Sequence, residues 1–123
     1  MRRLWNAFFY SLAGLRAAWD EPAARLEIWL LAGAIPSALV LPVGVVEKLL
    51  LIGSTVAIFI VEILNTSVEA AIDRISADRH PLSKLAKDLG SAAVFVSALF
   101  AAGVWAAIVG PLLAALVMTL AIA

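Results

Sequence analysis

The chain has 123 residues, of which 64% are hydrophobic, and its mean hydropathy is +1.05. A soluble core of this size could not bury so much apolar surface, so the composition excludes an ordinary soluble domain and indicates a single integral membrane domain. The formal net charge is zero, and no nucleic-acid partner is expected. The chain has no cysteine and one histidine, His80, which excludes a disulfide framework, a thiolate metal site and a multi-histidine metal site.

Residues 1–24 combine a helical repeat of hydrophobic residues with arginines. The repeating positions are Leu4, Phe8, Leu12, Leu15 and Trp19, and the arginines are Arg2, Arg3 and Arg16. This pattern predicts an amphipathic helix on the membrane surface, followed by a turn at Pro22. A cleaved signal peptide is the alternative, but Arg16, Asp20 and Glu21 interrupt the segment before an apolar core develops. We therefore expect the segment to remain in the mature protein.

Three apolar segments follow, and we expect each of them to cross the membrane. The expected spans are 25–42, then 45–75 with a cytoplasmic extension, and 84–123, also with a cytoplasmic extension. The polar connection 76–83 is predicted to be a loop, and Gly110-Pro111 is predicted to mark a kink or the end of the third span. The predicted fold class is an all-α membrane protein with three transmembrane helices and an N-terminal surface helix.

The basic residues predict the orientation of the spans. They gather before the first span and around the loop 76–83, whereas Lys48 alone lies on the other side. By the positive-inside rule, the N-terminus and this loop lie in the cytoplasm and the C-terminus lies outside. We therefore expect a multi-pass protein of the cytoplasmic (inner) membrane.

Three acids and one amide follow the apolar run of the second span. We call Glu62, Asn65, Glu69 and Asp73 the polar stripe. On a helix that advances about 100° per residue, the three acids fall within about 40° of one another and Asn65 lies about 60° to the side. Acids near membrane depth usually face a bundle interior or a watery cavity, so the stripe is a predicted functional site. The alternative, strongest for Asp73, is that the last turns have simply left the lipid.

The cytoplasmic side collects many carboxylates and cations, which is typical of sites for hard metal ions and phosphates. The acids are Glu21, Glu27, Glu62, Glu69, Asp73, Asp78 and Asp88, and the cations are Arg3, Arg16, Arg25, Arg74, Arg79, Lys84 and Lys87. Ordinary ion pairing is the alternative, above all for Lys84 and Asp88, which stand four residues apart on one helix. No Gly-rich phosphate loop or protein-kinase signature is found, nor the residues of a serine hydrolase triad.

Two long motifs carry a family resemblance. The segments EILNTSVEAAIDRI (62–75) and AKDLGSAAV (86–94) resemble the prokaryotic diacylglycerol kinase family, the small trimeric membrane lipid kinases. GLRAAW (14–19) and AARLE (23–27) are similar to segments of the same family. The resemblance implies phosphorylation of the hydroxyl group of diacylglycerol by MgATP, with Mg²⁺ as cofactor. It also implies a homotrimer in which each active site is shared between chains.

The resemblance also implies a role for individual residues. Glu62 would be the general base, Glu21 and Glu69 would bind the metal ion, and Asn65 and Asp73 would support the stripe. The implied nucleotide-binding set is Arg3, Tyr10, Glu21, Glu69, Asp78, Arg79, His80, Lys87 and Asp88. The implied lipid-substrate set is Arg3, Ser11, Arg16, Trp19, Glu27, Glu62 and Ser91.

Two other functions remain open from the sequence. A kinase acting on undecaprenol, a polyprenyl alcohol, would carry the same acidic motif, although the surface helix and AARLE favour diacylglycerol. A non-enzymatic helical membrane protein, such as a transporter subunit whose acids relay protons, would show acid-dependent transport and no ATP turnover.

Overall fold

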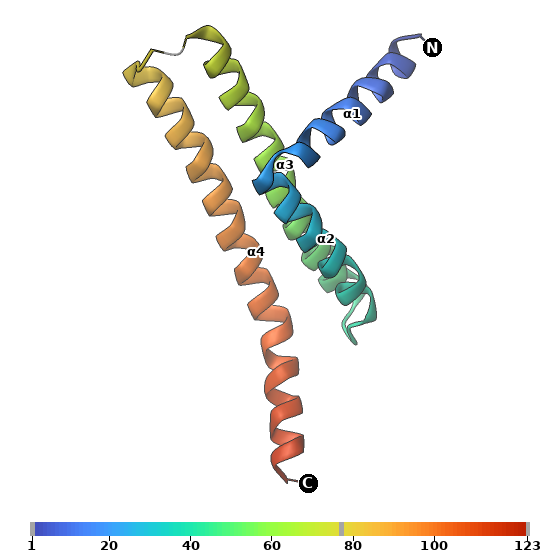
Figure 1. Ribbon diagram of the computed structural model, residues 1–123. Helices are drawn as coiled ribbons and strands as arrows, with labels where there is room; N and C mark the ends of the chain where they lie inside the picture. The colour runs from blue at the N-terminus through green and yellow to red at the C-terminus, as the bar shows by residue number, and fades with distance from the viewer. Residues whose placement is uncertain (1, 77, 123) are drawn as a thin grey trace.

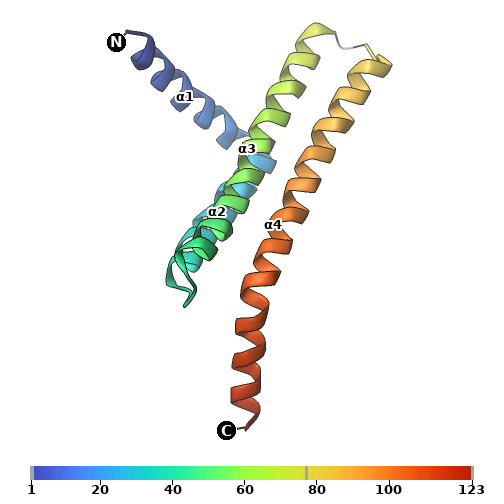
Figure 2. The same cartoon turned by 180° about the vertical axis from the view of Figure 1, so that it is seen from behind.

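The computed structural model describes residues 2–76 and 78–122, and these residues form four α-helices. Helices α2, α3 and α4 run side by side in alternating directions, with α3 packed against both of the others, and α1 projects away from them (Figures 1 and 2). The predicted all-α class is confirmed. Three of the helices, α2, α3 and α4, are long and apolar enough to cross a membrane. Their bounds are α1 Arg2–Asp20, α2 Pro22–Val40, α3 Val45–Ile75 and α4 Pro81–Ile122.

Arg25 fixes the junction between α1 and α2, where Glu21 alone separates the two helices. Its guanidinium donates hydrogen bonds to the carbonyls of Trp19 (3.1 Å) and Asp20 (3.3 Å). These carbonyls lie at the end of α1 and lack partners within that helix, so Arg25 satisfies them. Pro22 suits the first position of α2 because its missing N–H costs no helical hydrogen bond. The helix therefore begins at Pro22, ahead of the segment expected to cross the membrane.

The hairpin between α2 and α3 is closed by Lys48. Its Nζ donates a hydrogen bond of 2.7 Å to the carbonyl of Leu39, at the end of α2. Within α2 the helix continues through Gly33 and Pro36, and the Ser37 hydroxyl donates to the Gly33 carbonyl at 2.8 Å. The 19 residues of α2 span about 28 Å, which matches a hydrocarbon core about 30 Å thick.

Helices α3 and α4 are joined by polar contacts at two levels. Near the connecting loop, Lys87 Nζ lies 2.6 Å from Asp73 Oδ1. Deeper in the apolar region, the Trp105 indole N–H donates to the Thr55 hydroxyl at 3.0 Å, while that hydroxyl donates to the Leu51 carbonyl at 2.9 Å. Leu51 itself is fully buried. The two levels hold α3 and α4 in one register along most of α3.

Helix α4 includes the expected third span and begins before it. It starts at Pro81, where His80 caps it: the Leu82 N–H donates to His80 Nδ1 at 3.2 Å and the Lys84 N–H donates to the His80 carbonyl at 3.0 Å. It also continues through Pro111, so Gly110-Pro111 does not end the helix. A proline removes one helical hydrogen bond, which a membrane helix tolerates. The C-terminal part of α4 extends past the hairpin of α2 and α3 (Figures 1 and 2).

Few side chains are buried within one chain. The buried apolar residues are Ala18, Ala24, Ala38, Leu51 and Ala101. Alanines at these contacts let the helix backbones approach closely, which is the usual way that membrane helices pack. Large apolar side chains point outward along all four helices, as on a surface that faces lipid or other chains.

The hydrogen bond between Trp105 and Thr55 should couple α3 to α4 energetically. In a double-mutant cycle of Trp105→Phe and Thr55→Val, we expect a coupling free energy of about 0.6 kcal/mol and at most about 1.7 kcal/mol, the average and the maximum of such cycles inside a membrane protein. The measurement is the unfolding free energy of the four proteins in detergent or bicelles. Additive effects of the two substitutions would contradict a stabilising bond.

Candidate functional site

Four glutamates from three segments form what we call the acidic cluster: Glu21, Glu27, Glu62 and Glu69. Glu62, on α3, is only 7% exposed, and Glu27, on α2, is 9% exposed. The carboxylates of Glu69 and Glu21 are close enough to repel the charge of Glu62, and Glu62 in turn repels that of Glu27. The bend between α1 and α2 brings Glu21 toward the middle of α3. Mutual repulsion of buried carboxylates favours binding of a cation or sharing of protons.

Asn65 links the polar stripe together. Its side-chain Nδ2 donates a hydrogen bond of 3.2 Å to Glu69 Oε1, one helical turn further along α3. Two polar atoms of the site are buried without a protein partner: Asn65 Oδ1 and Glu27 Oε2. Buried oxygens of this kind can accept hydrogen bonds from a ligand or from water. Asp73 behaves differently from the other members of the stripe, because it is exposed and pairs with Lys87.

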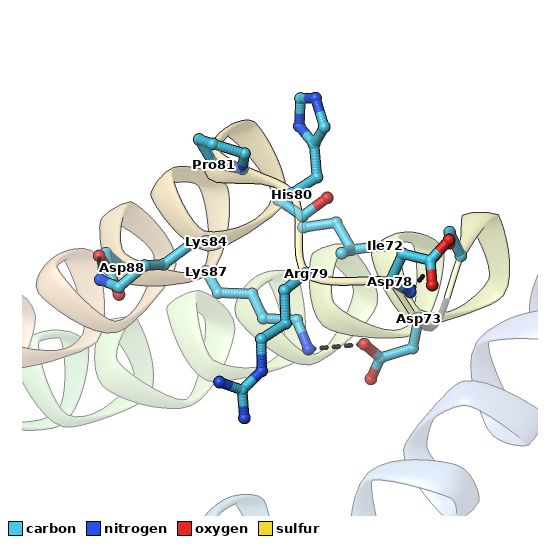
Figure 3. Close-up of a pocket in the computed structure, with 11 residues that line it drawn as sticks. Ile72, Asp73, Asp78, Arg79, His80, Pro81, Lys84, Lys87 and Asp88 are labelled. Atoms are coloured by element: carbon cyan, nitrogen blue, oxygen red, sulfur yellow. Dashed lines mark hydrogen bonds and ion pairs between the residues drawn. The ribbon is translucent and has the colours of Figure 1, made fainter.

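A pocket of about 790 Å³ lies at the loop end of α3 and α4 (Figure 3). It contains five of the residues expected to bind a nucleotide, together with Asp73. In Figure 3 the side chains of Lys87 and Arg79 extend to one side of the connecting segment, whereas the His80 ring points to the other side. The lining residues are Ile72, Asp73, Ser76, Asp78, Arg79, His80, Pro81, Ser83, Lys84, Lys87 and Asp88.

The pocket holds two solvent-exposed ion pairs, Lys87 with Asp73 and Lys84 with Asp88. The side chains of the first pair are 38% and 66% exposed, so water screens the attraction and the pair contributes little to folding. A weak pair can exchange partners at little cost. An incoming phosphate group could therefore recruit Lys87, while Arg79 adds a second cation to the same pocket.

The expected site residues of α1 lie apart from this pocket. Arg3, Tyr10 and Arg16 are exposed on a helix that points away from α3 and α4 in both views (Figures 1 and 2). The Ser11 hydroxyl donates to the Ala7 carbonyl of its own helix at 2.9 Å. Trp19 packs at 6.1 Å, centroid to centroid, against Trp29 of α2, and Ser91 is exposed on α4. One chain thus assembles the acidic cluster and the pocket but not the residues expected from α1.

Sequence reasoning missed several residues of the site. Arg25 was expected among the cations of the site and at the start of a span, but not as the residue that holds the α1–α2 junction next to Glu21. The pocket is also lined by Ile72, Ser76 and Ser83, for which no role was predicted. Their shared signal is position, since all of them lie within one turn or two of the loop between α3 and α4. The capping of α4 by His80 depends on local geometry, and no clear sequence pattern indicates it.

The donor set fits a magnesium ion bound in part by phosphate. Across residues 2–76 and 78–122, no three His, Cys, Asp or Glu side chains gather as ligands of one metal ion. Mg²⁺ does not need such a group, because it keeps several waters and usually binds through one or two carboxylates plus substrate phosphates. Glu69, oriented by Asn65, and the exposed Glu21 are oxygen ligands of the required kind.

A small bundle of membrane-spanning helices with buried acids beside a cationic pocket defines a membrane protein that handles charged ligands at the lipid boundary. A sequence model described as "Prokaryotic diacylglycerol kinase" matches residues 9–109. The chain is 46% identical over 109 residues to a diacylglycerol kinase of Pseudomonas aeruginosa, covering 88% of this chain and 89% of the relative. It is 44% identical to a diacylglycerol kinase of Escherichia coli K12 (84% and 85% covered) and 39% identical to one of Haemophilus influenzae (88% and 92% covered).

The chain belongs to the prokaryotic diacylglycerol kinase family. The family resemblance predicted from the two motifs is thereby confirmed, and the activity is that of an ATP-dependent lipid kinase. The family match ends at residue 109, so the last part of α4 lies outside it.

Lys87 should matter for nucleotide binding and not for folding. Lys87→Met removes a cation from the pocket, and we expect about tenfold or more weaker MgATP binding, the loss typical of one hydrogen bond to a charged group. The unfolding free energy should change little, because the pair with Asp73 is exposed and screened by water. Calorimetric titration and detergent unfolding measure the two quantities. The control is Arg74→Met, which removes the same charge outside the pocket lining; equal losses in both variants would contradict a specific role of Lys87.

Proposed function

We propose that the chain transfers the γ-phosphate of MgATP to the hydroxyl group of diacylglycerol, giving phosphatidic acid at the cytoplasmic face of the membrane. One observation carries the proposal: on the same pair of helices, a buried glutamate at the edge of the apolar region stands beside a polar, cationic pocket nearer the loop. Glu69 lies seven residues from Glu62, about 10 Å along α3. A lipid hydroxyl and a soluble triphosphate can therefore meet from opposite ends of one groove.

Glu62 is the proposed general base. It is buried among apolar helices, so a hydroxyl group that approaches from the lipid reaches its carboxylate without crossing water. Glu62 takes the proton of this hydroxyl as the oxygen attacks the γ-phosphorus, and ADP leaves with the electron pair of the broken bond. Asn65 and Asp73 support the site, Asn65 by its hydrogen bond to Glu69 and Asp73 by its pair with Lys87.

Glu69 and Glu21 are the proposed ligands of Mg²⁺. The ion would neutralise the charge of the phosphates and hold the triphosphate in line for attack. Both glutamates lie close to Glu62, and this proximity supports their assignment. For the nucleotide, we propose Asp78, Arg79, His80, Lys87 and Asp88 of the pocket, with Arg3 and Tyr10 of α1.

The lipid substrate is proposed to contact residues around the α1–α2 junction. Glu27 supports this assignment, because its buried Oε2 has no protein partner and can accept a hydrogen bond from the free hydroxyl group, the one O–H donor of diacylglycerol. Trp19 packs on Trp29 at the same junction and offers an aromatic anchor at the membrane interface. The remaining residues proposed near the lipid are Arg3, Ser11, Arg16, Glu62 and Ser91.

A homotrimer with shared sites is proposed because a single chain does not bring the proposed residues together. Tyr10 and Arg3 lie on a helix that points away from the pocket, so they can reach a nucleotide there only if α1 comes from another chain. Outward-facing apolar side chains on α2, α3 and α4 provide surface for such contacts. The proposed orientation puts the N-terminus and the α3–α4 loop in the cytoplasm and the C-terminus outside, on the distribution of basic residues.

The function is tested with radiolabelled ATP and purified protein in mixed micelles that contain either diacylglycerol or undecaprenol. Faster phosphorylation of diacylglycerol is expected. Faster phosphorylation of undecaprenol would assign the chain to the polyprenol-specific branch. Absence of ATP turnover with both lipids would overturn the proposal and favour a non-enzymatic role.

Substitutions of the two glutamates of the polar stripe should impair different steps of the reaction. Glu69→Gln removes a charged ligand of Mg²⁺, so MgATP should bind more weakly and the remaining activity should need more divalent ion. Glu62→Gln should leave MgATP binding nearly unchanged and lower turnover by about 10² to 10⁴, the contribution of a general base. MgATP binding and lipid phosphorylation across a Mg²⁺ titration separate the two cases. The opposite pattern would reverse the assigned roles, and full activity of both variants would refute the site.

Shared sites predict recovery of activity when two inactive variants are mixed. One variant carries Arg3→Ala and Tyr10→Ala on α1, and the other carries Glu69→Gln on α3. If each site takes α1 from one chain and α3 from another in a cyclic trimer, random mixing in equal amounts should restore about one quarter of the sites. The measurement is kinase activity after co-refolding of the two proteins, with each variant alone as control. No recovery in mixed oligomers would show that each chain completes its own site.

A further inference from the structure

The backbone of α4 comes close to the side chain of Asn65, a member of the polar stripe, at Gly90. A methyl group on Gly90 would overlap the side-chain oxygen of Asn65 and would lie 3.1 Å from its Cγ. The other two glycines of α4, Gly103 and Gly110, face open space, where a methyl group would meet no atom within 4 Å. Glycine weakens a helix interior relative to alanine. Its presence at residue 90 is therefore explained by the space that Asn65 requires.

Asn65 is held from two sides. Its Nδ2 donates to Glu69 Oε1 at 3.2 Å, and its Oδ1 is buried, without a protein hydrogen-bond partner, against the backbone of Gly90. The Asn65 oxygen occupies the space that a side chain at residue 90 would fill. The amide nitrogen of Asn65, which is the hydrogen-bond donor, therefore faces Glu69. The side chain of Asn65 thus links the absence of a Cβ at residue 90 to the orientation of the Glu69 carboxylate.

We propose that Gly90 is a positioning residue of the active site: its missing side chain fixes the amide of Asn65, and this amide orients Glu69 for its ligand. The inference rests on the proposed function insofar as Glu69 is assigned to Mg²⁺. Groups that orient a metal-binding carboxylate commonly change metal affinity by 10- to 100-fold when they are removed, which is the scale expected here.

A methyl group at residue 90 acts on the site rather than on the helix bundle. The atom that it would displace is the far end of a side chain, and a side chain rotates at lower cost than a helix backbone moves. Asn65 would turn away from Gly90 and lose its alignment with Glu69. The packing of α3 on α4 remains in place, because the two helices pack along much of their length and the hydrogen bond between Trp105 and Thr55 joins them away from residue 90.

The sequence offers a direct probe of this amide. Asn6 and Asn65 are the only asparagines of the chain, and there is no glutamine, so ¹⁵N-asparagine labelling gives side-chain NH₂ signals from two residues. We expect the Asn65 signal, assigned with Asn65→Ala, to move in Gly90→Ala as it does in Glu69→Ala. Gly103→Ala makes the same substitution on the same helix in open space and should leave the signal unchanged.

The second measurement is Mg²⁺-dependent binding of a non-hydrolysable ATP analogue to the full-length protein. The half-saturating Mg²⁺ concentration should rise about tenfold in Gly90→Ala and stay unchanged in Gly103→Ala. If Gly90 acts through Asn65, the double variant Asn65→Ala/Gly90→Ala should behave like Asn65→Ala alone, because the methyl group then meets no side chain.

An unmoved Asn65 signal in Gly90→Ala would overturn the proposal, and so would a double variant clearly worse than Asn65→Ala, which would mean that Gly90 acts through helix packing. If Glu69 does not bind the metal ion, the experiments give a different result. Glu69→Ala would then bind the analogue with wild-type Mg²⁺ dependence. In that case a displaced Asn65 signal would still support the link from Gly90 to Asn65, and only the assignment of Glu69 to the metal would fall.

Discussion

Burial of the Glu62 carboxyl group among apolar helices costs free energy unless polar partners, a proton or a ligand replace the water that it loses. The structure surrounds this group with further acids instead of with cations, since Glu21, Glu27 and Glu69 all lie nearby. Such a cluster repels itself and is relieved by a cation or by proton transfer. The elements around it follow from this constraint: Arg25 fixes the bend that brings in Glu21, and Asn65 orients Glu69.

Three cationic residues lie at a different level from the buried glutamates. Lys87, Arg79 and Lys84 lie in the pocket near the loop, while the described part of α4 beyond Asp88 carries no charge at all. This separation keeps the cations from neutralising the buried glutamates directly. Instead, a ligand with its own negative charges and an accompanying metal ion can join the two levels. The weak, exposed pairs of Lys87 with Asp73 and Lys84 with Asp88 release their partners at little cost.

Hydropathy was sufficient to predict most of the fold. Long apolar runs separated by Pro42-Val43-Gly44 and by the polar segment after Ile75 give three helices, and the arginine-flanked repeat before Pro22 gives a fourth. The ends of the helices were less predictable because they depend on single hydrogen bonds. The imidazole of His80 caps α4 and moves its start to Pro81, and α4 passes through Pro111 since its neighbours in the helix are strongly apolar.

The candidate site was predicted unevenly. Residues on one helix, such as Glu62, Asn65 and Glu69, could be grouped from periodicity alone, and in the structure Asn65 donates a hydrogen bond to Glu69. Contacts between helices could not be grouped in this way. The register of α3 on α4, which brings Gly90 against Asn65, depends on packing along the whole pair, and a glycine in an apolar helix is too common to indicate such a contact.

The length of α4 has a consequence for the membrane around the protein. Its 42 residues extend about 63 Å, and the uncharged part after Asp88 alone measures about 50 Å. A hydrocarbon layer of about 30 Å would require a tilt beyond 50° to cover this length, whereas transmembrane helices rarely exceed about 40°. Some apolar surface therefore exceeds the bilayer at the end remote from the site. The resulting mismatch, worth fractions of a kcal/mol per Å, favours thicker membranes and local thickening of the lipid around α4.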